Sequence, residues 1–238
     1  MHNIADNLHK VMRRIDFSVN NSKFPAKKPL LLAVSKGQPK EDVLEAYRCG
    51  LREFGENYLQ EALAKIDALR DLKDIHWHFL GPIQSNKTRP IAEHFSWVHS
   101  VERFRIAERL SRQRPDNLPP LNLCLQINID NSPSKAGIHP EEALELAMAI
   151  SALPRLKLRG LMAIPDPHGD DPGRPFRALC NLLDKLKTSR PVLASLDTLS
   201  MGMSGDLEAA IAEGATIVRV GTDIFGPRKP KPPSTPVP

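Results

Sequence analysis

The sequence predicts an α/β fold in which eight parallel strands alternate with helices around a closed barrel. Short apolar runs, typical of buried strands, alternate along the chain with longer segments of helical periodicity. This alternation repeats about eight times in 238 residues, which is the size of a (β/α)8 barrel, or TIM barrel. A doubly wound sheet is the alternative, but it usually has fewer strands, and no GxGxxG motif follows the first apolar run. We therefore expect residues 1–226 to form one barrel domain.

The expected elements follow one another at short intervals. One extra helix, over residues 4–20, precedes the barrel. The expected strands share short apolar runs and cover residues 30–34, 51–54, 76–80, 97–99, 121–128, 156–161, 195–199 and 216–220. The expected helices lie between them and cover residues 39–49, 57–71, 84–94, 102–113, 140–153, 175–188 and 204–212. Gly50 and Gly214 stand where helices would stop, and Pro154 ends the helix that Pro140 opens.

Composition narrows the functional classes. The net charge is +5 and the isoelectric point is about 9.2, which would suit an anionic partner. However, the Lys and Arg residues are spread along the chain and aromatic residues make up only 5%. We therefore do not expect a nucleic-acid-binding surface.

Targeting and redox signals are also informative. No apolar run approaches the 18 or so residues of a membrane span, and the first ten residues, MHNIADNLHK, lack the apolar region of a secretory signal. Cys49, Cys124 and Cys180 are scattered, which argues against a disulfide framework or a cysteine metal site. We expect a cytoplasmic protein, and a monomer, because no apolar seam demands a dimer. Residues 227–238 are rich in proline and are expected to form a solvated tail.

Lys36 is the most informative residue, because it directly follows the expected first strand. In a barrel, chemistry takes place at the carboxyl ends of the strands. A lysine at the rim of an apolar core is partly desolvated, which favours a neutral amine that can form a Schiff base with an aldehyde. The alternative is a lysine that merely extends past the strand end into solvent.

The loops after the seventh and eighth expected strands have the composition of a phosphate site. They contain Ser200, Gly202, Ser204, Gly221 and Thr222. Glycines let backbone N–H groups approach an anion, and barrels commonly bind phosphate in these two loops. The alternative is that these residues only form turns.

Arg219 lies within the otherwise apolar strand IVRVG and points to the face opposite Val218 and Val220. If that face is the barrel interior, the guanidinium needs an acceptor. A structural partner such as Glu53 and a heteroatom of a ligand satisfy this requirement equally well.

Several motifs together resemble those of the pyridoxal phosphate homeostasis proteins. These proteins are similar in fold to the N-terminal barrel of alanine racemase. The similarity spans residues 4–226 and is carried by AVSK (33–36), FGENYLQE (54–61), HFLGPIQSNK (78–87), LSMGMSGD (199–206) and VRVGTDIFG (218–226).

The resemblance implies that the chain binds pyridoxal 5′-phosphate (PLP), and it assigns roles to seven residues. Lys36 would form the Schiff base, Arg219 would face the pyridine nitrogen, and Asn57 and Met201 would line the pocket. The 5′-phosphate would be held by Ser200, Gly221 and Thr222. Gly37 departs from the family, where threonine is frequent. Lys135 and Gly137 match a family loop but receive no role.

The resemblance further implies that the chain buffers and delivers PLP to PLP-dependent apo-enzymes, without robust catalysis of its own. An arginine beside the pyridine nitrogen disfavours a protonated ring, which makes the ring a weaker electron sink. A racemase of this fold also needs a tyrosine from a second domain as a base, whereas Tyr47 and Tyr58 lie early in this chain.

Three other functions stay open. An amino-acid racemase that depends on PLP is the main alternative. A metal-dependent hydrolase would use His76 and His78, which alternate on one strand, but no histidine ends the fifth or sixth strand. A sugar-phosphate enzyme would use Lys36 without PLP.

Overall fold

The computed structural model describes residues 3–21, 28–166 and 171–227. Within them, eight parallel strands close a barrel in the order β1 to β8, in which β1 pairs with both β2 and β8. The strands are β1 (Leu30–Val34), β2 (Glu53–Glu56), β3 (His76–Phe79), β4 (Trp97–Val101), β5 (Leu121–Gln126), β6 (Leu156–Met162), β7 (Thr198–Ser200) and β8 (Ile217–Val220). The fold is therefore the expected TIM barrel.

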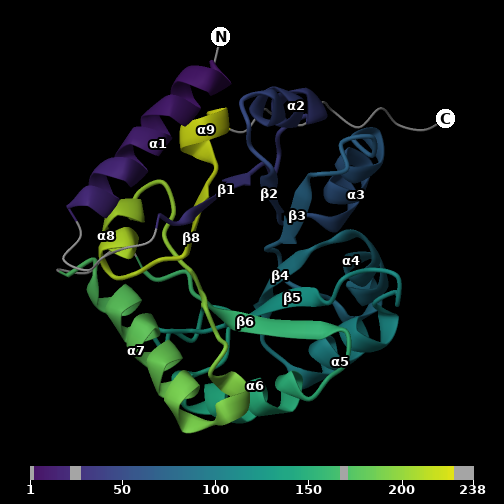
Figure 1. Cartoon of the computed structure of the whole chain (residues 1–238), viewed down its shortest axis with the longest axis vertical. Coiled ribbons are helices and arrows are strands. Elements are labelled where there is room, and N and C mark those ends of the chain that lie inside the picture. The colour runs from purple at the N-terminus through teal and green to yellow at the C-terminus, as the bar shows by residue number, and fades with distance from the viewer. Residues whose placement is uncertain (1–2, 22–27, 167–170, 228–238) are drawn as a thin grey trace.

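Helices surround the ring of strands (Figure 1). They are α1 (Ile4–Asn20), α2 (Lys40–Arg48), α3 (Leu59–Ala68), α4 (Thr88–His94), α5 (Phe104–Gln113), α6 (Ala143–Ser151), α7 (Arg174–Ser189), α8 (Leu207–Ala212) and α9 (Thr222–Phe225). Their apolar faces pack on the outward side chains of the strands and form the main core. No helix in the described ranges is both long and apolar enough to cross a membrane.

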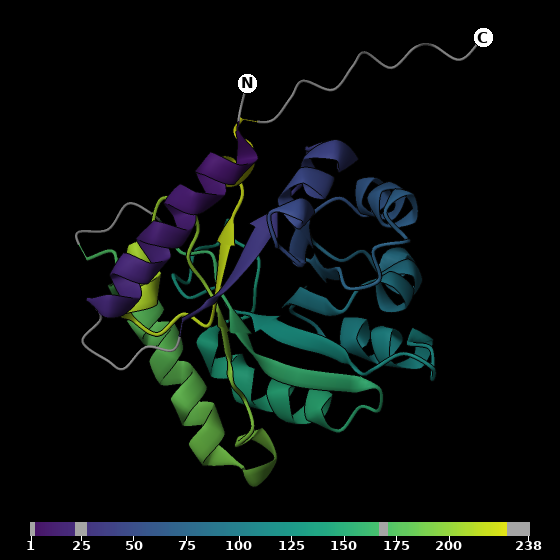
Figure 2. The same ribbon diagram turned by 45° about the horizontal axis from the view of Figure 1, so that its top comes forward.

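The extra helix α1 packs beside α8 and α9 at the periphery of the barrel (Figures 1 and 2). Its buried residues Ile4, Leu8, Val11 and Ile15 recur at helical spacing and form one apolar face. Asn3 caps the helix by accepting a hydrogen bond from the backbone N–H of Asp6 at 3.2 Å. Helix α1 therefore stabilises the segments that follow β7 and β8.

Several element bounds differ from the expected ones by a few residues, and three differences affect the site or the barrel interior. Strand β2 begins two residues later than predicted and ends at Glu56. It can include two carboxylates because Glu53 is bonded to histidines and Glu56 to a buried lysine. Residues 195–197 lie outside β7, because the chain still turns here after the 3-10 helix Pro191–Leu193.

The short helix α9 was not predicted, and with it every strand is followed by a helix. Of the expected proline-rich tail, residues 228–238 lie outside the described part of the chain.

Candidate functional site

A cavity of about 280 Å³ opens at the carboxyl ends of the barrel strands. Residues from the two ends of the described chain meet there because β8 closes the barrel against β1. The cavity is lined by Val34, Lys36, Gln38, Asn57, Leu80, Met162, Ile164, Met203, Ser204, Gly205, Arg219, Gly221, Thr222 and Gly226. Its wall thus combines two cationic side chains, hydroxyl and amide groups, and apolar side chains, a mixture typical of small-molecule sites.

Lys36 follows β1 and contributes to the cavity wall, as does Val34 two residues earlier. The peptide groups on both sides of Lys36 are held from outside the barrel. Lys65 Nζ donates to the Ser35 carbonyl oxygen at 2.7 Å, and the Gly37 N–H donates to Glu61 Oε1 at 2.6 Å. These bonds fix the backbone from which the Lys36 side chain extends.

The two bonds belong to a buried ionic cluster formed by Glu56, Glu61 and Lys65. Lys65 Nζ lies 2.7 Å from Oε1 of each glutamate, and Ser35 Oγ donates to the same Glu56 oxygen at 2.6 Å. Glu56 is fully buried and Lys65 is 5% exposed. Burial raises the pKa of Glu56 above its ordinary value, while the Lys65 charge opposes this rise.

Arg219 points into the barrel from β8 and is 5% exposed. Its Nη1 donates to Ser200 Oγ and its Nη2 to the Ala163 carbonyl oxygen, each at 3.0 Å. Burial lowers the pKa of Arg219 to about 10, so the group stays a cation at neutral pH. Glu53 is therefore not its direct partner, although the two are linked through other side chains.

The loops after β7 and β8 contribute Ser204, Gly205, Gly221 and Thr222 to the cavity. A Cβ atom at Gly221 would lie 3.0 Å from the Val34 carbonyl oxygen, so the absence of a side chain allows the loop to pack closely against β1. Backbone N–H groups that begin a helix such as α9 have no acceptor within the helix and can bind an anion.

Arg14 of α1 holds these loops together. Its Nη2 donates to the Ser204 carbonyl oxygen at 2.8 Å, and its guanidinium also pairs with Glu208 on α8 and Asp223 on α9. Sequence reasoning did not identify this residue, because nothing local to α1 shows which loops the helix will contact.

Five of the seven expected site residues line the cavity: Lys36, Asn57, Arg219, Gly221 and Thr222. Ser200 and Met201 are not part of its lining. Ser200 is fully buried inside the barrel, where its Oγ contacts Arg219 and His99. Met201 is fully buried in the hydrophobic core, because side chains alternate between the two faces at the end of β7. Ser204, which was also expected in this loop, and Gly205 line the cavity instead.

Gln38 was also missed, although it follows Lys36 by only two residues. It is 5% exposed, and its Nε2 donates to the Gly226 carbonyl oxygen at 3.4 Å. Its Oε1 is buried with no hydrogen-bond partner among the described residues, and Asn57 Oδ1 is in the same situation. Buried acceptors at a cavity wall call for a hydrogen-bond donor, which a ligand or an ordered water supplies.

Gly81 allows the strand-end segment that carries Asn57 to pack closely. A Cβ atom at Gly81 would lie 2.0 Å from the Asn57 carbonyl oxygen, so one of the two backbones must move. We expect Gly81→Ala to reduce the free energy of unfolding by about 1–3 kcal/mol, measured by denaturant titration.

The matched control for this substitution is Gly50→Ala. Gly50 has a positive φ of 97° but no atom within 4 Å of an added Cβ, so only backbone strain of about 1–2 kcal/mol is expected. Equal stability of Gly81→Ala and the native protein would contradict the steric argument.

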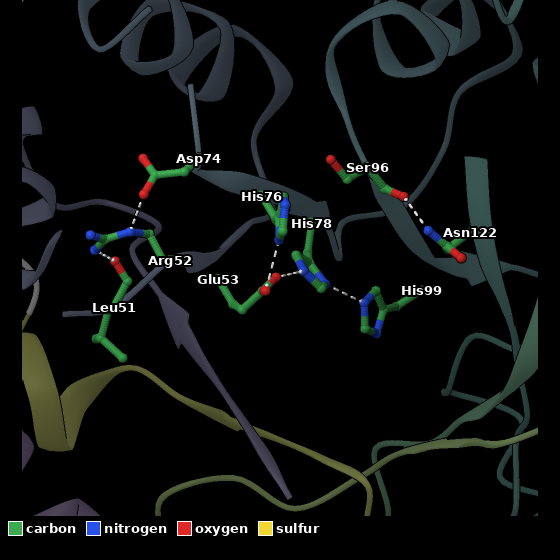
Figure 3. A network of polar contacts seen from close by, with 9 residues as sticks. All are labelled: Leu51, Arg52, Glu53, Asp74, His76, His78, Ser96, His99 and Asn122. Carbon is green, nitrogen blue, oxygen red and sulfur yellow. Dashed lines mark hydrogen bonds and ion pairs between the residues drawn. The ribbon is translucent and has the colours of Figure 1, made fainter. Parts of the chain in front are cut away.

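His76 and His78 both contact Glu53, each through one of its two carboxylate oxygens, at 2.8 and 2.7 Å (Figure 3). Within the described ranges, no group of three or more His, Cys, Asp and Glu side chains could hold a metal ion. His78 is thus part of a polar network inside the barrel, His76 is exposed at its edge, and neither lines the cavity.

Comparison with known proteins places these features in a family. The family model for the alanine racemase N-terminal domain matches residues 4–229. A pyridoxal phosphate homeostasis protein of Pseudomonas aeruginosa is 55% identical over 230 residues, which are 96% of this chain and 97% of that protein. The protein of that name in Escherichia coli is 49% identical over 233 residues, which are 96% of this chain and 98% of that protein.

Solved structures agree with the fold. PipY of Synechococcus elongatus with PLP bound superposes with a TM-score of 0.82 at 40% identity, over 94% of this chain and all of PipY. Alanine racemase of Corynebacterium glutamicum shares the fold at a TM-score of 0.64 and 17% identity, over 96% of this chain and 62% of its own. The chain belongs to the pyridoxal phosphate homeostasis proteins of the alanine racemase N-terminal domain family.

Proposed function

We propose that this protein binds PLP through a Schiff base on Lys36, and that it buffers and delivers the cofactor without robust catalysis of its own. One observation carries the proposal: Lys36 and Arg219 line the same cavity as the two loops suited to a phosphate. PLP bound to the 40% identical PipY and the name of the close relatives support it.

The residues of the cavity fit PLP. An amine can bond to the aldehyde, Ser204, Gly221 and Thr222 can hold the phosphate with hydroxyl and backbone N–H groups, and apolar side chains can cover the ring. PLP supplies an aldehyde and a conjugated ring that can withdraw electrons. The expected roles of Ser200 and Met201 become indirect in this proposal, because neither residue lines the cavity.

The same cavity favours storage of PLP over turnover. Arg219 stays charged at neutral pH, and a cation near the pyridine nitrogen disfavours a protonated ring and so weakens carbanion stabilisation. Both tyrosines are described, and neither lines the cavity. Tyr47 donates instead to Asp74 at 2.6 Å. Exchange of the α-hydrogen of L-alanine faster than with free PLP would favour the racemase alternative.

The direct test uses the native protein with added PLP, visible absorption and borohydride. We expect an absorption band that borohydride converts into a stable adduct, and peptide mass spectrometry should place that adduct on Lys36. The other lysines in the same digest are the internal control. A colourless protein, or an adduct spread over surface lysines, would contradict the proposal and leave a sugar-phosphate enzyme as the alternative.

Arg14 provides a second test, because it fixes the two loops without lining the cavity. We expect Arg14→Ala to weaken PLP binding by a factor of about 2–10, which corresponds to about 0.4–1.4 kcal/mol. Titration with PLP measures the change, and the exposed neighbour Arg13 serves as a matched control through Arg13→Ala. Equal affinities of the two variants would show that Arg14 has no role in positioning the loops.

Delivery, oligomeric state and compartment are further parts of the proposal. All three cysteines are free, which suits a reducing cytoplasm. We propose a monomer that passes PLP to PLP-dependent apo-enzymes. Mixing the PLP-loaded protein with such an apo-enzyme should restore the activity of that enzyme faster than the same amount of PLP released by dilution.

Size-exclusion chromatography with light scattering measures the oligomeric state.

A further inference from the structure

A continuous chain of polar side chains crosses the barrel interior, from Arg219 at the cavity to Glu53 at the amino end of β2. Ser200 Oγ lies 2.8 Å from His99 Nδ1 and accepts from Arg219 on its other side. His99 Nε2 lies 2.9 Å from His78 Nδ1. His78 Nε2 lies 2.7 Å from Glu53 Oε2 (Figure 3). Such an interior is unusual, since bulky aliphatic side chains dominate in most TIM barrels.

Burial keeps the two histidines of this hydrogen-bond chain, His78 and His99, neutral. His78 and His99 are fully buried. Burial lowers the pKa of each below its ordinary value. The hydrogen bond and charge of Glu53 oppose this effect at His78 without reversing it, and the charge of Arg219 adds to it at His99. Burial alone would raise the pKa of Glu53, but the hydrogen bonds with His78 and His76 outweigh it and leave the pKa lowered. Glu53 is thus a carboxylate at neutral pH.

Only one arrangement of protons then satisfies every bond. A carboxylate accepts only, so the proton of His78 is on Nε2 and its Nδ1 is an acceptor. His99 must therefore donate from Nε2, which leaves its Nδ1 as an acceptor. Ser200 Oγ must then donate to His99 and accept from Arg219. All donors point in one direction, from the cation at the cavity to the carboxylate at the far end of the barrel.

We propose that Glu53 is a positioning residue for Arg219, acting through His78, His99 and Ser200 to hold the guanidinium in one orientation at the cavity wall. The role rests on the proposed binding of PLP in that cavity. Because the hydroxyl proton of Ser200 is committed to His99, the serine presents a lone pair to Arg219. The remaining N–H groups of the guanidinium are then free to face a ligand. The aligned dipoles also link the buried guanidinium of Arg219 to a carboxylate that does not touch it, while the charge of Asp206 acts on Arg219 directly.

The proton arrangement can be measured without any ligand. Long-range 1H–15N spectra of the protein with 15N-labelled histidine should show His78 and His99 neutral at pH 7, both with the proton on Nε2. A proton on Nδ1 of His99, or a charged imidazolium at either position, would overturn the proposal. The same spectra of Glu53→Leu should show at least one of the two rings shifted to the Nδ1–H form, whereas Glu53→Gln retains an acceptor and should keep both on Nε2.

The effect on the cavity is measured by the affinity for PLP and the absorption maximum of the bound form. We expect Glu53→Leu to weaken binding severalfold and to shift the maximum. His76→Ala should change neither the affinity nor the maximum. His76 contacts Glu53, but it is exposed and is not one of the residues that link Glu53 to Arg219. A native spectrum and native affinity in Glu53→Leu would overturn the proposal.

Ser200→Ala breaks the same series of hydrogen bonds at the end next to Arg219. It provides the test if Glu53→Leu does not fold. It should shift the absorption maximum in the same direction. Combined with Glu53→Leu, Ser200→Ala should change the affinity and the absorption maximum little further, because both substitutions break the same series of hydrogen bonds. Fully additive effects would overturn the proposal. A native protein that shows both Nε2–H rings but binds no PLP would refute the proposed function and this role of Glu53, while leaving the proton arrangement confirmed.

Discussion

Replacing Lys36 with alanine is expected to abolish covalent attachment of PLP. The cavity keeps Arg219 and the loop residues Gly221 and Thr222, so we expect PLP to bind still, but without the absorption band that borohydride can fix. The loss of a charge-assisted contact of about 1.5–3 kcal/mol predicts an affinity about 10–150 times lower, even before the covalent bond is considered. Absorption spectroscopy and equilibrium dialysis measure the two effects separately.

Lys40→Ala is the matched control, because Lys40 is exposed at the start of α2, four residues further along. It should retain the native spectrum and affinity. If Lys36→Ala kept a band that borohydride fixes to the protein, another amine would be the attachment site. Lys65 would not be a candidate, because it is 5% exposed and bonded to Glu56 and Glu61 outside the cavity lining.

The sequence contains enough information to predict the barrel and the end of the barrel that carries the site. Apolar runs locate the strands, and the position of Lys36 directly after one of them places its amine at the barrel rim. Parallel strands bring their carboxyl ends together, so Asn57 and Thr222 could be expected near Lys36 although they are far apart in sequence.

The phosphate loop after β7 could be predicted only approximately, because alternation of side chains depends on the exact end of the strand. Strand β7 ends at Ser200, which places Ser200 inside the barrel and Met201 in the core. A shift of one residue in the expected strand exchanges the two faces. Ser204 reaches the cavity because it belongs to the turn beyond, where no such alternation applies.

The polar interior could not be predicted from the sequence. Glu53, His78 and His99 lie on the neighbouring strands β2, β3 and β4, and the closed barrel brings Ser200 of β7 to the same series of hydrogen bonds. Glutamate and histidine are ordinary on a protein surface, and only the alternation of His76 and His78 on one strand left a metal site open. Register between β2 and β3 places Gly55 opposite His78, and a Cβ atom at Gly55 would lie 2.8 Å from Leu80 Cδ1, so the glycine makes room for Leu80 inside the barrel.

Lys65→Met is expected to be the most destabilising of the substitutions considered, with a loss of about 3–5 kcal/mol in the free energy of unfolding. The change leaves Glu56 fully buried with no cation beside it. It also removes the donor to the Ser35 carbonyl oxygen next to Lys36. Denaturant unfolding measures the stability, and Glu61→Gln is the control, because Glu61 is 25% exposed and its loss costs less. A loss below about 1 kcal/mol would contradict the role of this cluster.

The pH dependence of Lys65→Met distinguishes an uncompensated charge from a simple loss of packing. Burial already raises the pKa of Glu56, and without the Lys65 charge to oppose it the pKa rises further. The folded state then binds a proton more tightly than the unfolded state does. The resulting stability is therefore present at low pH and is lost as pH rises through the folded-state pKa. Adding Glu56→Gln to Lys65→Met should remove this dependence and recover part of the stability, because a neutral amide costs less to bury than a carboxylate. A pH-independent loss in the single variant would mean that packing, and not charge, explains the effect.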